Sequence, residues 1–270
     1  MEPACSALSR ECILARLAPS ALGWMRELRV HREIDSTNSH LMNRAVVETV
    51  DGVVCVADHQ TNGRGRRGRT WLTPAGGSIA LSLGREISVV VAEIAPLSLV
   101  VGLAVANAIS RSGLRGISLK WPNDVLLDGA KVGGILIELV GSTIPLVVVI
   151  GVGINVGSGT EVGARLGIAV GDIRTQHLGV SRNELIAEVV CNIHDLTTRF
   201  ESQGFSGIRP EWERLHFHQN RPVEVVGVNE TIEGVARGVT ASGALILETS
   251  LGIRYFTVGE VSLRGKLGTG

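Results

Sequence analysis

Two consecutive β-strands are encoded by KVGGILIELVGSTIPLVVVIGVGINV, residues 131–156. Val, Ile and Leu dominate residues 131–140 and 145–156, which is typical of buried strands, and the residues between them supply a turn. A third strand is expected just upstream, at residues 117–120. Strands joined by short turns tend to pair with their neighbours, so this part of the chain predicts a largely antiparallel sheet.

Helices and further strands are expected around these three strands. Additional strand patterns occur at residues 28–34, 53–58 and 78–85, and helical patterns at residues 11–17, 36–47, 93–110, 182–203 and 208–216. The pattern at 93–110 is apolar nearly all round, which indicates a buried helix. Ser181 and Glu184 form a capping box before the longest helix, and Gly204 follows its end. The fold class is therefore α+β: a mixed, largely antiparallel sheet flanked by helices.

Beyond Asn220 the pattern changes to short strands separated by Gly or Asn turns. These strands are expected at residues 222–228, 231–239, 244–248, 253–257 and 261–264. Such spacing is typical of a small β-barrel. We expect a first domain at residues 1–219 and a small barrel domain at residues 220–270.

The composition excludes a general polyanion-binding protein. Lys plus Arg and Asp plus Glu both number 26, so no overall basic field attracts nucleic acid or an anionic membrane. Hydrophobic residues make up 44% of the chain and aromatic residues only 3%. The core is therefore expected to consist mainly of Val, Ile, Leu and Ala.

Cysteine spacing and apolar runs argue against secretion and membrane insertion. Cys5, Cys12, Cys55 and Cys191 show no paired spacing, so a disulfide framework or zinc site is not expected, and they are interpreted as small buried hydrophobic residues. No signal-peptide pattern is present at the N-terminus. The longest apolar run, residues 87–109, contains Glu93, Pro96 and Asn107, which favours a buried helix over a membrane span. These features predict a cytoplasmic protein without membrane association.

An arginine-rich segment, Gly63-Arg64-Gly65-Arg66-Arg67-Gly68-Arg69, is followed closely by Trp71. The alternating glycines disfavour a regular helix and let backbone N–H groups approach a ligand. The segment therefore indicates a local anion site, with non-specific nucleic-acid binding as the alternative.

Three further segments carry polar residues at strand ends. Lys120-Trp121-Pro122-Asn123-Asp124 places an amide and a carboxylate in a turn, where the carboxylate could hold Mg²⁺; an ordinary self-bonded turn is the simpler interpretation. Lys131 precedes Gly133 and Gly134, so an ammonium and open backbone can meet one small ligand. Asn155 ends a very apolar run and needs a polar partner.

Taken in this order, the motifs resemble the bacterial biotin protein ligase family. The matching segments are residues 35–38, 60–71, 120–124, 131–136, 151–156, 220–223 and 259–264. The resemblance spans about residues 28–264 and implies a class II synthetase-like catalytic domain followed by an SH3-like barrel. It implies the stand-alone form, because the 35 residues before Ser36 are too few for the DNA-binding helix-turn-helix domain of some members.

The resemblance also implies roles for individual residues. Biotin contacts are expected from Ser36, Thr37, Asn38, Gln60, Gly63, Arg64, Arg66, Lys131 and Gly134. Nucleotide contacts are expected from Arg66, Arg67, Arg69, Trp71, Lys120, Asn123, Asp124, Lys131 and Asn155. Arg66 and Lys131 are the expected catalytic residues, and Asp124 the expected Mg²⁺ ligand.

The implied reaction joins biotin and ATP to give biotinyl-5′-AMP and pyrophosphate, then transfers biotin to a lysine of a biotin carboxyl carrier protein. An anion attacks an anion in the first step, so cations and Mg²⁺ are needed where phosphate charge develops. No specific DNA partner is expected, and the protein is expected to be a monomer or weak homodimer. The alternatives are a lipoate ligase of the same fold and a nucleic-acid-binding module.

Overall fold

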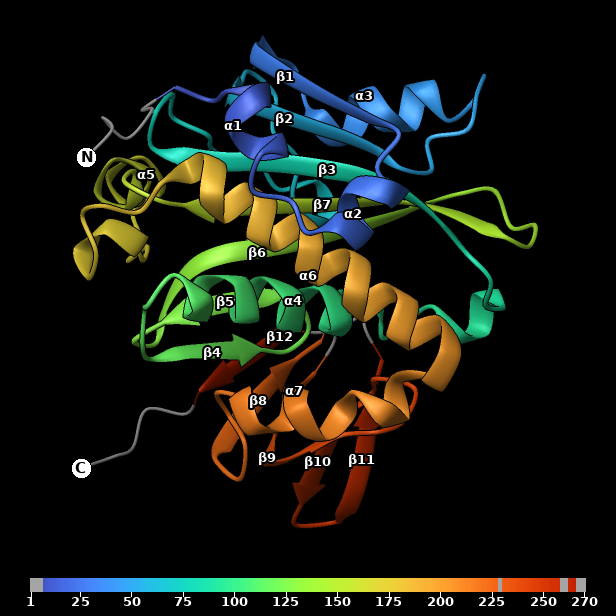
Figure 1. Cartoon of the computed structure of the whole chain (residues 1–270). Helices are drawn as coiled ribbons and strands as arrows, with labels where there is room; N and C mark the ends of the chain where they lie inside the picture. Colours follow the sequence, from blue (N-terminus) through green and yellow to red (C-terminus); the bar gives the residue numbers. More distant parts are fainter. Residues whose placement is uncertain (1–6, 228–229, 258–261, 266–270) are drawn as a thin grey trace.

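A computed structural model describes residues 7–227, 230–257 and 262–265 and contains two separate β-sheets (Figure 1). The larger sheet has seven strands in the order β1-β2-β3-β7-β6-β5-β4. Their bounds, in chain order, are β1 (Glu27–Ile34), β2 (Val53–Gln60), β3 (Ser78–Ile87), β4 (Ile117–Lys120), β5 (Asp124–Leu127), β6 (Ala130–Val140) and β7 (Leu146–Asn155). Only β1 and β2 pair in parallel, which confirms the mixed, largely antiparallel sheet.

Strand β7 lies in the middle of this sheet and is buried at nearly every position. It pairs with β3 from Ser78 opposite Asn155 to Ile87 opposite Leu146, and with β6 on its other side. The pairing covers both edges of β7, and the burial of nearly all its residues means that both faces are covered as well. This explains its nearly continuous apolar sequence.

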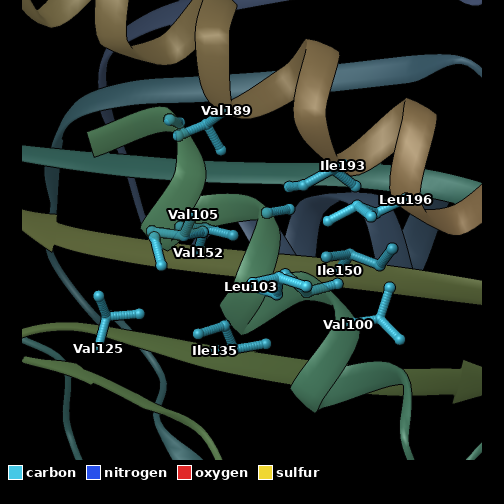
Figure 2. Packing of buried hydrophobic residues seen from close by; sticks show 14 of the residues in the cluster. Val100, Leu103, Val105, Val125, Ile135, Ile150, Val152, Val189, Ile193 and Leu196 are labelled. Atoms are coloured by element: carbon cyan, nitrogen blue, oxygen red, sulfur yellow. The ribbon is translucent and has the colours of Figure 1, made fainter. Parts of the chain in front are cut away.

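Helices cover the two faces of the large sheet. The helices are α1 (Arg10–Leu14), α2 (Pro19–Trp24), α3 (Thr37–Arg44), α4 (Leu97–Arg111), α5 (Gly159–Leu166), α6 (Arg182–Gln203) and α7 (Arg209–Leu215). Short 3₁₀ turns lie at η1 (Arg66–Gly68), η2 (Val91–Glu93), η3 (Ile173–Thr175) and η4 (Phe205–Gly207). Helices α4 and α6 pack side by side on one face, whereas α3 packs on β2, β3 and β7. Figure 2 shows Leu103 of α4 among apolar side chains of β7 and α6.

Most of the expected elements are confirmed, with differences at their ends. The predicted N-cap of α6 is present: Ser181 Oγ accepts a hydrogen bond from the Glu184 N–H at 3.4 Å, and Gly204 is the C-cap. The Glu184 carboxylate pairs with Arg16 at 2.9 Å. Helix α4 begins at Leu97, four residues later than expected, because residues 91–93 form a 3₁₀ turn. Helices α2 and α5 and strand β5 were not predicted. Pro19 opens α2, where a missing N–H costs nothing.

The C-terminal strands form the second, fully antiparallel sheet in the order β11-β10-β9-β8-β12. Their bounds are β8 (Pro222–Val226), β9 (Thr231–Val239), β10 (Leu245–Thr249), β11 (Gly252–Phe256) and β12 (Ser262–Gly265). This arrangement agrees with the expected SH3-like barrel. The expected strand positions 228 and 261, and residues 259–261 of the family motif, lie outside the described residues.

Hydrogen bonds between described residues join the C-terminal sheet to the preceding part of the chain. Trp121, 1% exposed, donates a hydrogen bond from Nε1 to the Gly243 carbonyl oxygen at 3.1 Å. The Val239 N–H donates to Glu213 of α7 at 3.1 Å. The barrel is thus fixed next to the turn that carries Asn123 and Asp124. Among the described helices, none is both long and apolar enough to cross a membrane.

We predict that Leu103→Ala lowers the free energy of unfolding by about 2–5 kcal/mol, because it leaves a cavity between α4, α6 and the sheet. Leu103 is 1% exposed. The control is Leu251→Ala, at a side chain that is 97% exposed, for which the change should stay within about 0.5 kcal/mol. Urea denaturation of both variants measures this; equal effects would contradict the buried position of α4.

Candidate active site

A cleft of about 380 Å³ opens above β3, β6 and β7, between the N-terminus of α3 and the β4–β5 turn. The structure brings almost all of the predicted site residues to this cleft. Those lining it are Ser36, Thr37, Asn38, Gln60, Arg64, Arg66, Arg67, Arg69, Trp71, Lys120, Asn123, Asp124, Lys131, Gly134 and Asn155. Gly63 is the exception.

The α3 end of the cleft is a buried hydrogen-bonded pocket. Ser36 caps α3 through a 3.3 Å bond from the Ser39 N–H to its Oγ. The Thr37 N–H and hydroxyl both donate to Gln60 Oε1, at 2.8 and 3.1 Å. Gln60 Nε2 in turn donates to Thr73 Oγ1 at 3.0 Å. Gln60 is therefore held in one orientation, which leaves the pocket with fixed donors and acceptors.

Two residues that were not predicted, Ser82 and Glu138, complete this pocket. Ser82 Oγ lies 2.7 Å from Thr37 Oγ1 and 2.5 Å from Asn38 Oδ1, and its single proton can serve one of them at a time. Glu138 accepts from Asn38 Nδ2 at 2.9 Å and from Arg64 at 2.6 Å. Glu138 thus ties the arginine-rich loop to α3. The available signal was an acidic residue within the otherwise apolar segment 132–140.

The arginine-rich segment forms a closed loop over the cleft. The Gly65 N–H donates to the Arg69 carbonyl at 2.7 Å, and the Trp71 N–H donates to the Gly63 carbonyl at 2.9 Å. Gly63 lies at the base of this loop, where a Cβ would come within 2.2 Å of the Trp71 carbonyl oxygen. Its lack of a side chain therefore lets the loop close, whereas the residue itself does not line the cleft.

Trp71 lies flat against the backbone of β6 and β7. A Cβ at Gly153 would be 2.3 Å from Trp71 Cε2, and one at Gly134 would be 3.4 Å from its Cζ3. The Lys131 ammonium lies 5.7 Å from the centre of the Trp71 ring, within the range of a cation–π contact. The two glycines of β6 and β7 therefore create the space that the indole fills.

Two buried polar atoms in the cleft have no partner among the described residues: Trp71 Nε1 and Asn155 Oδ1. Buried polar atoms are normally hydrogen-bonded, because leaving one unpaired costs about 1–3 kcal/mol. Such atoms in a cleft indicate where a polar ligand binds. The expectation that Asn155 needs a partner from outside its strand agrees with this geometry.

The rim of the cleft concentrates cations near a single carboxylate. Lys131 Nζ lies 2.5 Å from Asp124 Oδ1, and Arg66 donates to Asn123 Oδ1 at 3.0 Å. Burial, with repulsion from Arg67, lowers the pKa of Arg66 from its ordinary value. Burial likewise lowers the pKa of Lys120, against the opposing effect of Asp124. Burial makes the charged forms of Arg66 and Lys120 less stable than they are in water. An anionic ligand would offset this loss of stability.

Asn123 and Asp124 differ in how the backbone presents them. The Trp121–Pro122 peptide is cis, and Asn123 follows it in the turn, where its Nδ2 donates to the Ile135 carbonyl at 3.0 Å. Asp124 is the first residue of β5, opposite Lys120. The expectation of a turn is confirmed for Asn123, whereas Asp124 belongs to the strand that was not predicted.

Helix α5 and the segment after it form an apolar wall that sequence reasoning missed. Val162, Leu166, Ile168, Ala169 and Val170 line the cleft together with Leu263 and Arg264 of β12. The signal available was weak: a short amphipathic stretch that ends at Gly167, whose φ is +67°. These apolar side chains share the cleft with the predicted nucleotide residues.

Comparison with known proteins agrees with this architecture. The profile of the Biotin/lipoate A/B protein ligase family matches residues 30–155, and that of the Biotin protein ligase C terminal domain matches residues 218–264. The bifunctional ligase/repressor BirA of Escherichia coli is 37% identical over 237 residues, covering 86% of this chain and 72% of that protein. The biotin--[acetyl-CoA-carboxylase] ligase of Paracoccus denitrificans is 31% identical over 238 residues, covering 86% and 98%.

Among solved structures, the biotin protein ligase from Aquifex aeolicus in complex with biotin and ATP is similar in fold. Its TM-score is 0.78 at 29% identity, covering 90% of this chain and all of that one. The mixed sheet, the cationic cleft and the first profile define a protein of the biotin and lipoate ligase class. With the C-terminal domain and these relatives, the chain belongs to the biotin protein ligase family.

We predict that Gly153→Ala displaces Trp71, because the new methyl group would overlap the indole ring. In 5-fluorotryptophan-labelled protein, the ¹⁹F resonance assigned to Trp71 with a Trp71→Phe variant should shift more than the other tryptophan resonances. Gly102→Ala is the control, since its Cβ would meet only ordinary contacts at 3.6 and 3.9 Å. An unchanged Trp71 resonance in Gly153→Ala would contradict the close packing.

Proposed function

We propose that this cleft joins biotin to ATP at its centre and then releases the biotinyl group to a lysine of a biotin carboxyl carrier protein. Biotin ligation to protein is the activity of the family, and the C-terminal domain favours biotin over lipoate. The observation that carries the proposal is the continuity of one cleft, from the polar pocket at α3 to the cationic loop and Trp71. The carboxylate of one substrate must meet the α-phosphate of the other, so both pockets must open into the same space.

The pocket at α3 is proposed to hold the biotin ring. Its polar contacts would come from Ser36, Thr37, Asn38, Gln60 and Arg64, with Gly134 giving backbone access, whereas Gly63 would act by letting the loop close. The support is that Gln60 and Thr37 are already fixed by bonds to one another and to Thr73. A pocket that is rigid before binding loses little conformational entropy when the ligand enters.

The opposite end of the cleft is proposed to hold the nucleotide. Trp71 would contact the adenine ring, Asn123 and Asn155 would bond the nucleotide, and Arg67, Arg69 and Lys120 would neutralise phosphates. The unpartnered Asn155 Oδ1 requires a donor, which the ribose hydroxyls or a metal-bound water of this substrate can provide. Arg66 and Lys131, which contact Asn123 and Asp124, would meet the biotin carboxylate and the α-phosphate.

Asp124 is the proposed Mg²⁺ ligand. Its carboxylate is half-buried beside the cations proposed to neutralise phosphates, and it already faces a positive charge, Lys131, at 2.5 Å. Mg²⁺ is usually held by one or two carboxylates together with substrate phosphates, so a single aspartate fits this metal. When bound, Mg²⁺ would withdraw charge from the phosphates.

The residues of the chain supply position and charge rather than a nucleophile. Lys131 and Arg66 would stabilise the negative charge that develops as the biotin carboxylate attacks the α-phosphate and pyrophosphate leaves. The closed loop and the apolar wall after α5 would then exclude water from the mixed anhydride. The neutral amine of the acceptor lysine attacks its carbonyl, AMP leaves, and the amine proton passes to solvent.

Further properties are proposed from the same geometry. Residues 1–219 would form the catalytic domain and residues 220–270 the barrel domain. The chain would be a cytoplasmic monomer or weak homodimer. It would not bind specific DNA, since Arg64 and Arg66 of the loop form hydrogen bonds within the cleft. Gel shifts at two salt concentrations, with and without biotin and ATP, should show at most weak, sequence-independent binding.

The deciding experiment incubates the protein with MgATP, biotin and a biotin carboxyl carrier domain and measures the intact mass of the carrier. Addition of one biotin, absent from a carrier whose acceptor lysine is replaced by arginine, is the expected result. A parallel reaction with lipoate tests the alternative ligase. Transfer of lipoate with no transfer of biotin would overturn the proposal.

We predict that Arg66→Ala keeps the fold and releases biotinyl-5′-AMP faster, because the loop loses its bond to Asn123. Release is measured with radiolabelled adenylate by rapid gel filtration. Arg254→Ala, an arginine of the barrel paired with Glu230 at 3.2 Å, is the control and should leave release unchanged. Unchanged release in Arg66→Ala would remove the protective role of the loop.

We predict that Lys131→Ala slows adenylate formation by an amount equivalent to about 2–4 kcal/mol, and slows transfer from supplied biotinyl-5′-AMP far less. The reason is that phosphate charge builds mainly in the first half-reaction. The two rates are measured separately, and Lys131→Arg, which keeps the charge, should recover part of the first. Equal damage to both half-reactions would assign Lys131 to general ligand binding.

A further inference from the structure

A second cluster of ligating side chains, separate from the cleft, lies between the sheet and α3. Its members are His31 of β1, His40 of α3 and Cys55 of β2. His31 pairs with Ala57 in the parallel β1–β2 register, so Cys55, two residues earlier, points to the same face of the sheet. One ligand atom from each of the three residues lies within 4.8 Å of the other two.

The cluster is buried and its polar atoms are incompletely paired. Cys55 is 0% exposed, and the two imidazole rings are half-buried with centroids 5.4 Å apart. The Nε2 atoms of both histidines are buried and have no hydrogen-bond partner among the described residues. Two unpaired imidazole nitrogens beside a thiol are unfavourable unless a further group satisfies them.

The surroundings of His40 favour its neutral form, which is the form that binds metals. Burial is the main cause that lowers the pKa of His40, with His31, Arg29 and Arg44 adding to it and Asp35 opposing. Arg44 and Arg29 both pair with Glu27, Arg44 at 2.6 Å, so their charges are partly compensated.

The thiol needs a metal ion to ionise in this environment. Burial raises the pKa of Cys55 to about 12, so the free side chain stays protonated at neutral pH. A bound divalent ion deprotonates a coordinating thiol outright. Binding would replace the S–H bond with a sulfur–metal bond and release one proton to solvent, with no oxidation or reduction.

We propose that His31, His40 and Cys55 bind one transition-metal ion that accepts mixed nitrogen and sulfur ligands, with Zn²⁺ as the reference ion. Zinc takes Zn–N distances of about 2.0–2.1 Å and a Zn–S distance of about 2.3 Å, with water able to fill a fourth position. Tetrahedral geometry then requires ligand atoms about 3.3–3.7 Å apart, which the half-buried imidazoles reach by small rotations.

The position of the site gives it a structural consequence. The metal would join β1, β2 and α3 one turn beyond Thr37 and Asn38, which line the biotin pocket. It would therefore hold the pocket-bearing end of α3 against the strand that carries Gln60. Metal binding should raise the melting temperature of the ligand-free protein.

The test titrates the reduced, full chain with Co²⁺ and then Zn²⁺ in the absence of biotin and ATP, so its result does not depend on ligase activity. One equivalent of Co²⁺ should produce a thiolate-to-cobalt charge-transfer band that Zn²⁺ abolishes. His31→Gln and His40→Gln should each weaken Zn²⁺ binding at least about tenfold while the fold, checked by circular dichroism, is retained. Cys55→Ser should remove the charge-transfer band.

Controls separate this site from other cysteines and histidines. Cys12→Ser and His177→Gln alter a thiol and an imidazole outside the cluster and should leave the band and the affinity unchanged. If Cys55→Ser fails to fold, the Zn²⁺ affinities of His31→Gln and His40→Gln decide the test. The absence of a thiolate band, or Zn²⁺ affinity that is equal in His40→Gln and the parent protein, would overturn the proposal.

Discussion

The absence of side chains at two alternate positions of β7 is the constraint on which the cleft depends. A Cβ at Gly151 would lie 2.3 Å from Asn38 Oδ1, and one at Gly153 would lie 2.3 Å from Trp71 Cε2. Asn38 and Trp71 therefore rest directly on the backbone of the central strand. The same strand is buried between β3 and β6, so it cannot move aside to make room for larger residues.

Electrostatics then sets how the cleft responds to an anion. Arg66 and Lys120 are partly removed from water, and burial lowers the pKa of both. Glu138 pairs with Arg64 and so ties the loop to β6, whereas Asp124 pairs with Lys131 between β5 and β6. Burying these cations costs folding stability, and a bound polyanionic nucleotide would offset that cost.

The sequence predicted most of the fold because its signals were local. Val and Ile runs, the Ser181 capping box and the apolar helix before Arg111 each depend on neighbours within one turn or one strand. Strand β5 and helices α2 and α5 were not predicted because they are short and Pro or Gly lies at or near their ends. The predicted site residues also came together in one cleft, although Gly63 supports the loop rather than lining the cavity.

The sequence by itself determined the class of fold, most of the polar residues of the cleft and the resemblance to biotin protein ligases, since these are written in contiguous motifs. Only the tertiary structure decided that Glu138 links Arg64 to Asn38, and that Cys55, interpreted as a simple buried residue, lies beside His31 and His40. The physical reason is that these groups belong to different strands and helices. Their proximity depends on which strands pair and on the packing of α3 against the sheet, and the spacing of residues within one element shows neither.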